Sequence, residues 1–148
     1  MKTSQSGIDL IKWWEGFRSQ AYKDSVGLPT IGYGTLIDTI DEQYLLTATI
    51  TMEVAERLLK LELVDIEWRM NRLIQQPINQ NQFDSLASFC YNLGTGNLKR
   101  STLLKKININ PSDPTIRAEF AKWHNAGGVE LKGLVRRRQA EADLYFTE

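Results

Sequence analysis

Apolar residues recur with a helical period along several stretches of the chain, and glycine and proline separate these stretches. Apolar positions at residues 8, 11 and 14 predict a first helix. Ser4 or Ser6 can cap its start, and Gly16 can end it. Between residues 17 and 36, glycine and proline interrupt short apolar runs. This pattern predicts small strands joined by tight turns.

A long helical pattern follows, from Thr51 as a plausible N-cap to the Gln76–Pro77 pair. Asn79 or Asn81 is predicted to start the next helix, and Gly94 to end it.

Three shorter helical patterns complete the chain, and they cover about residues 102–108, 114–126 and 134–145. Ser101 or Thr102 caps the first of them. Asp113 and Pro114 have the residue types of an N-cap and a first helical position, so they predict the start of the second, which runs through Trp123. The Gly127–Gly128 pair is predicted to end it.

This order of elements predicts an α+β fold that is mostly helical. A small N-terminal β-lobe is joined by a long helix to a C-terminal helical bundle. We expect one domain over residues 1–148, whose parts cover about 1–50 (first helix and β-lobe), 51–75 (connecting helix) and 76–148 (helical lobe). A cleft between two such lobes is a common place for a substrate.

The composition limits the cellular locations and the cofactors that we expect for this protein. No stretch approaches the ~20 apolar residues that span a bilayer. The N-terminal segment has one lysine and no apolar core, so we expect no secretory signal and a cytoplasmic location in the producing cell. The lone Cys90 cannot form an internal disulfide, and with a single histidine in the chain we expect no Cys/His metal site and no cofactor.

Charge is unevenly distributed although the chain is formally neutral. Residues 1–98 carry eight basic and twelve acidic residues, whereas residues 99–148 carry ten basic and six acidic ones. A basic C-terminal part suggests contact with an anionic partner such as nucleic acid, lipid headgroups or cell wall. Solvated helix faces are the simpler explanation.

Glu15, Asp24 and Thr30 carry the candidate chemistry. Glu15 ends the first predicted helix, and Asp24 and Thr30 lie in the turn-rich segment that can fold back toward it. Glycoside cleavage needs a protonated carboxyl for the leaving oxygen and a carboxylate, alone or with a hydroxyl, to direct water. Trp13, Trp14 and Phe17 can exclude water around Glu15 and favour its protonated form. The spacing alone is weak evidence.

The residues around this trio strengthen the argument. Residues 15–36 read Glu-Gly-Phe-Arg-Ser-Gln-Ala-Tyr-Lys-Asp-Ser-Val-Gly-Leu-Pro-Thr-Ile-Gly-Tyr-Gly-Thr-Leu. This segment resembles the catalytic segment of phage-type lysozymes, glycoside hydrolase family 24, whose pattern is Glu-Gly, then Ala-Tyr-x-Asp, then Gly-x-x-Thr-Ile-Gly-Tyr-Gly. The resemblance covers nearly the whole chain and continues at residues 81–86, 91–94, 101–104, 123–128 and 133–138.

The resemblance implies a lysozyme-like fold and an endolysin, an enzyme that hydrolyses the β-1,4 bond between N-acetylmuramic acid and N-acetylglucosamine for host cell lysis. It implies Glu15 as the general acid and Asp24 with Thr30 as the pair that holds the attacking water. Such a pair predicts an inverting reaction. Leu36, Tyr91 and Thr102 match sugar-contacting positions, and the alternative is that all three are ordinary core or cap residues.

The resemblance also implies partners and a location. Peptidoglycan glycan strands are the expected substrate, and a holin is the expected functional partner for release. We expect a monomer that stays in the host cytoplasm until the membrane is permeabilised and then acts in the periplasm.

Three other functions remain open at this point. One is a lytic transglycosylase, which has no need of the water-holding Asp24 and Thr30. Another is a non-catalytic wall-binding module. The third, a nucleic-acid-binding helical domain, is disfavoured by the zero net charge and by the Glu15–Asp24–Thr30 segment.

Two further features are singled out. Many family members have histidine where this chain has Thr35, so we expect a different local bonding network there without loss of chemistry. The run Arg136-Arg137-Arg138 is interpreted as a solvated basic face, from which a single arginine could turn toward Glu15 or the substrate carboxylate.

Overall fold

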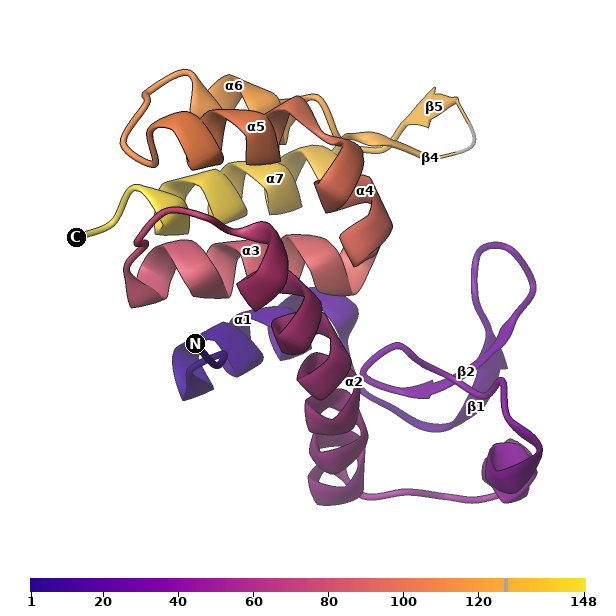
Figure 1. The fold of residues 1–148 in the computed structure, drawn as a ribbon. Coiled ribbons are helices and arrows are strands. Elements are labelled where there is room, and N and C mark those ends of the chain that lie inside the picture. Colours follow the sequence, from indigo (N-terminus) through magenta and orange to yellow (C-terminus); the bar gives the residue numbers. More distant parts are fainter. Residues whose placement is uncertain (127) are drawn as a thin grey trace. The chain divides into compact units, whose positions relative to one another are not determined.

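The computed structural model of the chain describes residues 1–126 and 128–148, and it divides into two compact units. The sheet unit comprises Asp9–Val64, and the helical unit comprises Met1–Ile8 together with Asp65–Glu148. Helices α1 (Gln5–Glu15) and α2 (Met52–Leu73) each contribute residues to both units. Figure 1 shows the order of the helices and strands along the chain. The mostly helical α+β class predicted from the sequence is confirmed.

The sheet unit is built on a three-stranded antiparallel sheet with the strand order β1-β2-β3. Besides its parts of α1 and α2, the unit contains β1 (Arg18–Lys23), β2 (Pro29–Gly32), β3 (Thr35–Leu36) and the 3-10 helix η1 (Ile40–Leu46). Thr30 pairs with Tyr22 on one side and with Leu36 on the other, so it lies in the middle strand. The small strands predicted for residues 17–36 are therefore confirmed.

The two helices of the sheet unit end and begin where the sequence predicted. Gly16 follows α1 with a φ of +69°, a conformation that glycine adopts without steric cost, and its N–H donates to the carbonyl of Lys12 at 3.0 Å. Thr51 precedes α2, and its Oγ1 accepts a hydrogen bond from the N–H of Val54 at 3.2 Å. Thr51 thus satisfies one of the free donors at the start of α2.

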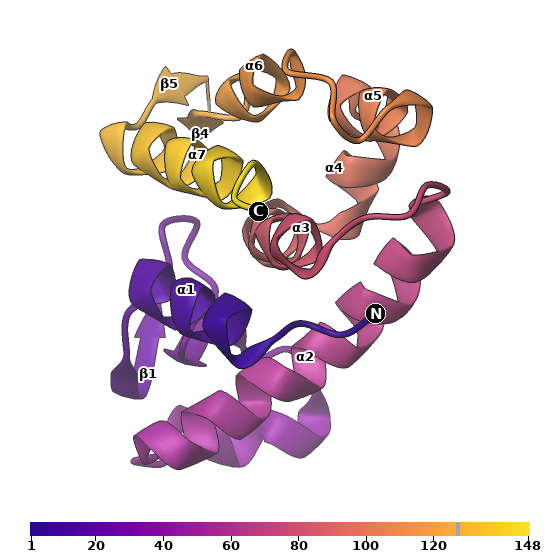
Figure 2. The ribbon, with the colours of Figure 1, turned by 90° about the vertical axis from the view of Figure 1, so that its left-hand side faces the viewer.

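The helical unit is a bundle around a buried aromatic cluster. It contains α3 (Gln80–Leu93), α4 (Thr95–Arg100), α5 (Thr102–Ile109), α6 (Ile116–Ala121), α7 (Lys132–Tyr145) and a short hairpin of β4 (Asn125–Ala126) and β5 (Val129–Glu130). Figures 1 and 2 show α7 packed between α3 and α6. Edge-to-face contacts link Phe89 to Phe120 and to Trp123, with ring centroids 6.0 and 5.6 Å apart. Such pairs add to the stabilisation from apolar burial.

Two helix caps in this unit also follow the sequence prediction. Asn79 forms a capping box with Gln82, in which each side chain accepts from the backbone N–H of the other residue. Ser101 caps α5, because its Oγ accepts from the N–H of Leu104 at 3.0 Å. Gly94, with a φ of +85°, ends α3 as predicted.

The prediction for α6 was wrong at both ends. Asp113 Oδ1 accepts hydrogen bonds from the backbone N–H and the hydroxyl of Thr115, at 2.8 and 2.7 Å. These bonds stabilise a turn, so the helix begins at Ile116 and not at Pro114. It ends at Ala121, before Trp123. Gly127 in the predicted stop lies outside the described residues. The sequence patterns also did not predict α4 or the hairpin.

The solvated basic face expected at Arg136–Arg138 was wrong for two of its three residues. Arg136 is exposed, whereas Arg137 and Arg138 are only 4% and 0% exposed. Arg138 Nε lies 2.7 Å from Oε2 of the fully buried Glu141, and Arg137 Nε donates to its Oε1 at 3.2 Å. Ser88 on α3 donates to the same Oε1 at 2.7 Å. Burial is possible because a carboxylate and a hydroxyl receive the guanidinium donors.

Among the described residues, no helix has the length and apolar character required to cross a membrane.

Candidate active site

Glu15 is the last residue of α1, and its carboxyl lies against the turn between β2 and β3. The side chain is half-buried. Trp14 and Phe17 are also half-buried, but Trp13 is 73% exposed, so the expectation that Trp13 shields Glu15 from water was wrong. Helix α1 thus ends by presenting a carboxyl to the sheet.

Gly34 makes room for that carboxyl. A Cβ atom at residue 34 would lie 2.7 Å from Glu15 Oε2, closer than real Cβ contacts come. The backbone at Gly34 also has a φ of +80°, which side-chain-bearing residues rarely adopt. Glycine therefore suits the turn at this point of the Gly-Tyr-Gly sequence and leaves room for the Glu15 carboxyl.

Asp24 and Thr30 both form hydrogen bonds with the backbone of Leu28. Asp24 Oδ1 accepts hydrogen bonds from the N–H groups of Val26 and Leu28, at 3.0 and 2.9 Å. The hydroxyl of Thr30 donates to the carbonyl of Leu28 at 3.0 Å. Thr30 is 3% exposed and Asp24 is half-buried. The turn after β1 thus brings the two residues together through the backbone of one residue between them.

Tyr22 lies within electrostatic reach of both acidic residues of the trio. Burial raises the pKa of its phenol, and the negative charges of Glu15 and Asp24 raise the pKa further, while Arg18 lowers it. The Arg18 guanidinium stacks over the Tyr22 ring at 4.3 Å from its centroid. Tyr22 pairs with Thr30 in the sheet, and its pKa responds to the charges of Glu15 and Asp24.

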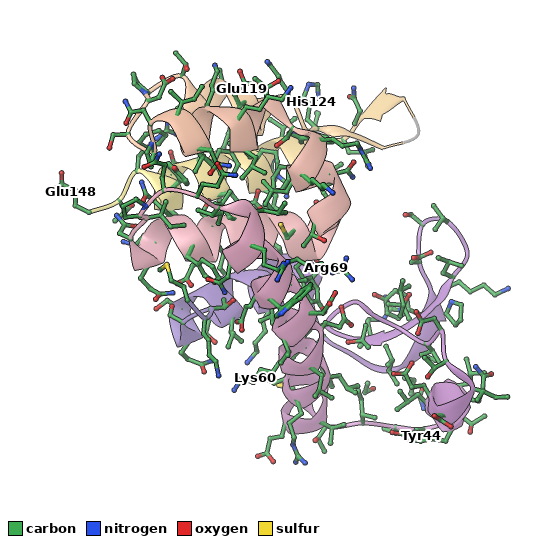
Figure 3. All side chains as sticks on the ribbon, in the orientation of Figure 1. Tyr44, Lys60, Arg69, Glu119, His124 and Glu148 are labelled. Atoms are coloured by element: carbon green, nitrogen blue, oxygen red, sulfur yellow. The ribbon has the colours of Figure 1, made fainter. Side chains whose placement is uncertain are left out.

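An ion-pair network joins α1 to α2 within the sheet unit. The Glu56 carboxylate on α2 forms ion pairs with Lys12 of α1 and with Lys60 of α2, each with a nitrogen–oxygen distance of 2.7 Å. Lys60 is labelled in Figure 3. Hydrogen bonds from these two lysines lower the pKa of Glu56 to about 2. The Lys12 ammonium also lies 5.3 Å from the ring centroid of Tyr33, in the turn beside Gly34. These contacts stabilise the helix end that carries Glu15.

The three predicted sugar-contacting residues are divided between the units. Leu36 lies on β3 opposite Thr30 and is 41% exposed. Tyr91 lies on α3 and is half-buried, and Thr102 is the exposed first residue of α5. Thr102 borders a surface cavity of about 280 Å³ together with Arg100 and Trp123.

The arrangement has the chemical groups that glycoside hydrolysis requires: a carboxyl at a helix end, and a carboxylate and a hydroxyl held at one turn. The sequence patterns did not single out Tyr22, which pairs with Thr30, Gly34, which lies against Glu15, or Glu62, whose pKa is raised in part by the charge of Glu15. Tyr22 and Gly34 could have been noticed, because both are part of the Ala-Tyr-x-Asp and Gly-Tyr-Gly motifs. Glu62 on α2 carries no local signal of this kind.

Comparison with known proteins places the chain in a family. The model of the family described as phage lysozyme matches residues 12–141. An endolysin of Salmonella phage P22 is 37% identical, with 99% of each chain covered. An endolysin of Bacillus phage B103 is 39% identical over 99% of this chain, which spans only 55% of that relative's length.

A solved structure agrees with these matches. The endolysin from Escherichia coli O157:H7 phage FAHEc1 superposes with a TM-score of 0.89 at 36% identity, and covers 99% of this chain and 94% of that one. The family model, the relatives and the fold all agree with the motif around Glu15. The chain therefore belongs to the phage lysozyme family.

Proposed function

We propose that the chain is an endolysin that hydrolyses the β-1,4 bond between N-acetylmuramic acid and N-acetylglucosamine in the glycan strands of peptidoglycan. Its family and its endolysin relatives support a lysozyme-type glycoside hydrolase. The observation that carries the proposal is that the Glu15 carboxyl at the end of α1 and the Asp24 carboxylate in the turn after β1 lie in the same unit as the Thr30 hydroxyl of the small sheet.

Glu15 is the proton donor in this mechanism. It donates its proton to the glycosidic oxygen as the bond to the leaving sugar breaks. Positive charge then develops at the anomeric carbon, which makes that carbon open to attack by water. Contacts to Gly34 and the end of α1 keep the carboxyl in place.

Asp24 and Thr30 direct the water. Both amide contacts of Asp24 involve Oδ1, so Oδ2 is the oxygen that can accept a proton from water. The hydroxyl of Thr30 donates a hydrogen bond to the Leu28 carbonyl, so the lone pairs of the hydroxyl oxygen remain available as acceptors. A water held by two acceptors attacks directly and inverts the anomeric carbon. In such sites the two carboxyls lie about 6.5–9.5 Å apart, against about 5–5.5 Å in retaining enzymes.

The central test is Glu15→Gln, which keeps the size of the side chain but cannot donate the acid proton. Turbidity loss of permeabilised Gram-negative cells should fall by about 10²–10⁴-fold. Glu53→Gln, which removes an exposed carboxylate at the start of α2, is the matched control and should lyse like the wild type. A folded Glu15→Gln protein with wild-type activity would show that Glu15 is not the acid.

The role of Asp24 needs a variant that keeps the turn. Asp24→Asn retains an oxygen that can accept from Val26 and Leu28 but removes the charge that activates water. We expect Asp24→Asn to lose turnover and to keep its thermal midpoint, whereas Asp24→Ala loses both. A glycosyl adduct trapped on Asp24 of the unmodified enzyme would refute the inverting reaction.

Thr30 is tested in the same way. Thr30→Ser keeps the hydroxyl and Thr30→Val removes it at similar volume, so only Thr30→Val should lose turnover. Mass spectrometry of the products distinguishes hydrolysis from the transglycosylase alternative. Only the transglycosylase reaction, in which water is not the nucleophile, forms an anhydro sugar. Binding to wall material without any cleavage would instead indicate a wall-binding module.

We propose that Leu36, Tyr91 and Thr102 contact the sugar chain and that the protein acts as a monomer. Replacing each of the three by alanine should raise KM more than it lowers kcat, because these residues would bind ground state and transition state alike. Unchanged KM in all three variants would contradict the proposed contacts with the sugar chain. Sedimentation at working concentration tests the monomer.

Release is proposed to depend on a second protein. A folded chain of 17.0 kDa does not cross a bilayer, because its polar surface would lose water. We therefore propose that it accumulates in the host cytoplasm and reaches the periplasm when a holin opens the inner membrane. Expression alone should be tolerated, and added chloroform should cause rapid lysis. Prompt lysis without any membrane-opening agent would contradict this route.

A further inference from the structure

One face of the small sheet carries a row of three side chains centred on Thr30. Tyr22 of β1 and Leu36 of β3 lie directly opposite Thr30 in the two neighbouring strands. Directly opposed residues of an antiparallel sheet project their side chains from the same face, with Cβ atoms about 4.5–5.5 Å apart. Tyr22 and Leu36 therefore flank the hydroxyl that we propose to hold the attacking water, and the sugar that this water attacks lies along the row.

Arg18 extends this row beyond Tyr22. The carbon of its guanidinium lies 4.3 Å from the centroid of the half-buried Tyr22 ring, while the Arg18 side chain itself is exposed. Stacking on a ring occupies one face of a guanidinium, and the N–H donors lie in its plane and point away to the side. Within the described part of the chain, no ion pair includes Arg18. The tyrosine thus holds a cation whose donors can receive an anion from another molecule.

The proposed substrate carries carboxyl groups on one of its two sugars only. N-acetylglucosamine is neutral, whereas N-acetylmuramic acid bears a lactyl group whose carboxyl is either free or extended by a stem peptide with carboxylates of its own. A planar guanidinium binds a carboxylate through two parallel N–H···O bonds. Arg137 and Arg138, from the run that the sequence offered for such a contact, are instead buried against Glu141. Arg18 lies on the sheet that holds the candidate chemistry.

We propose that Arg18 is a specificity-determining residue: its guanidinium, held against the Tyr22 ring, binds a carboxylate on the N-acetylmuramic acid side of the substrate. This inference rests on the proposed peptidoglycan substrate and names the part of it that the sheet distinguishes. The Asp24 carboxylate repels an anionic strand, and the Arg18 cation offsets this repulsion. A neutral polymer of N-acetylglucosamine gains nothing from Arg18.

The test measures binding apart from turnover. Purified glycan strands are titrated against the Glu15→Gln protein and against the same protein with Arg18→Gln added. The second substitution should raise the Kd about fivefold at low salt, the upper range for an exposed ion pair. The difference should vanish at about 1 M salt, where charges are screened within about 3 Å. Arg57→Gln, which removes an exposed arginine from α2 in the same unit, is the matched control and should leave the Kd unchanged.

Three strand preparations identify the carboxylate: strands with intact stem peptides, strands freed of them by an amidase, and strands whose carboxyls have been converted to methylamides. A higher Kd for the intact strands alone assigns the contact to the stem peptide. A higher Kd for the amidase-treated strands alone assigns it to the lactyl carboxylate, and an increase for both shows that Arg18 accepts either. Methylamide strands should bind equally with and without Arg18→Gln.

Arg18→Lys keeps the charge but not the planar fork, so it should recover part of the affinity for charged strands. Unchanged Kd values on both charged preparations would overturn the inference. It would also be overturned by an equal loss on the methylamide strands, which would indicate a packing role, or by an equal loss in Arg57→Gln. Absence of binding to every preparation would refute the proposed substrate itself, and this inference with it.

Discussion

Replacing Glu62 by glutamine should stabilise the protein, and the gain should grow with pH. In the folded protein the pKa of Glu62 is raised from 4.5 to about 7, mainly by burial. Between these values the folded chain holds a proton that the unfolded chain has lost. The free energy of unfolding due to this group therefore falls as pH rises through this range, and the full penalty is present above pH 7. Glutamine has no such proton to lose.

The size of the effect follows from the same values. One unit of pKa difference corresponds to about 1.4 kcal/mol, so the interval between 4.5 and about 7 corresponds to at most about 3.5 kcal/mol. Glu62 borders an open cavity and remains partly exposed, so solvent screens part of this penalty. We expect about 2 kcal/mol.

The assay is urea unfolding followed by circular dichroism at pH 5 and pH 8 for wild type, Glu62→Gln and Glu53→Gln. The stability difference between Glu62→Gln and wild type should increase by about 2 kcal/mol from pH 5 to pH 8. Glu56, whose pKa is about 2, does not titrate in this window. A difference that stays constant with pH would refute the reasoning, as would the same increase in Glu53→Gln.

Three further predictions concern packing, the turn beside Glu15 and a cap. Glu141→Gln leaves two buried guanidinium groups without their counter-charge and should cost about 3–5 kcal/mol in urea unfolding; a loss below about 1 kcal/mol would contradict the buried network. Gly34→Ala and Gly27→Ala both place a side chain at positive φ and should each cost about 1 kcal/mol, but only Gly34→Ala meets Glu15 and should abolish lysis. Equal activity of these two variants would disprove that contact. Asn79→Ala removes the capping box and should lower the free energy of unfolding by about 1 kcal/mol, whereas an unchanged urea midpoint would show that the cap is dispensable.

The candidate site could be predicted from the sequence as far as its residue types and spacing allow. Glu15, Asp24 and Thr30 were singled out as one group, and the structure places all three in the sheet unit, although their roles stay predictions. The sequence could not indicate that Leu28 links Asp24 to Thr30, because that link depends on the exact turn. Glu62 could not be found at all, since it approaches the site only through the packing of α2.

Local elements were well predicted where a few neighbouring residues decide them. The caps at Thr51, Asn79 and Ser101 and the stop at Gly16 each depend on contacts within four residues, so the sequence alone was sufficient. The predicted start of α6 was wrong because the Asp113 side chain could either cap a helix or stabilise a turn. It accepts two hydrogen bonds from Thr115 in the turn, and the sequence does not show which of the two conformations is more stable.

Burial of charged residues was decided only by the tertiary structure. The sequence of a run such as Arg137–Arg138 does not show whether its side chains are exposed to water or are buried against a carboxylate. Its burial depends on Glu141 one turn away and on Ser88, which is 49 residues from Arg137 in the chain. A charge is buried only when such partners converge on it, and their convergence is a property of the packed helices. The sequence therefore determined the family, the class of fold and the candidate chemistry, while the packing of distant segments determined which charges are buried and at what pH Glu62 ionises.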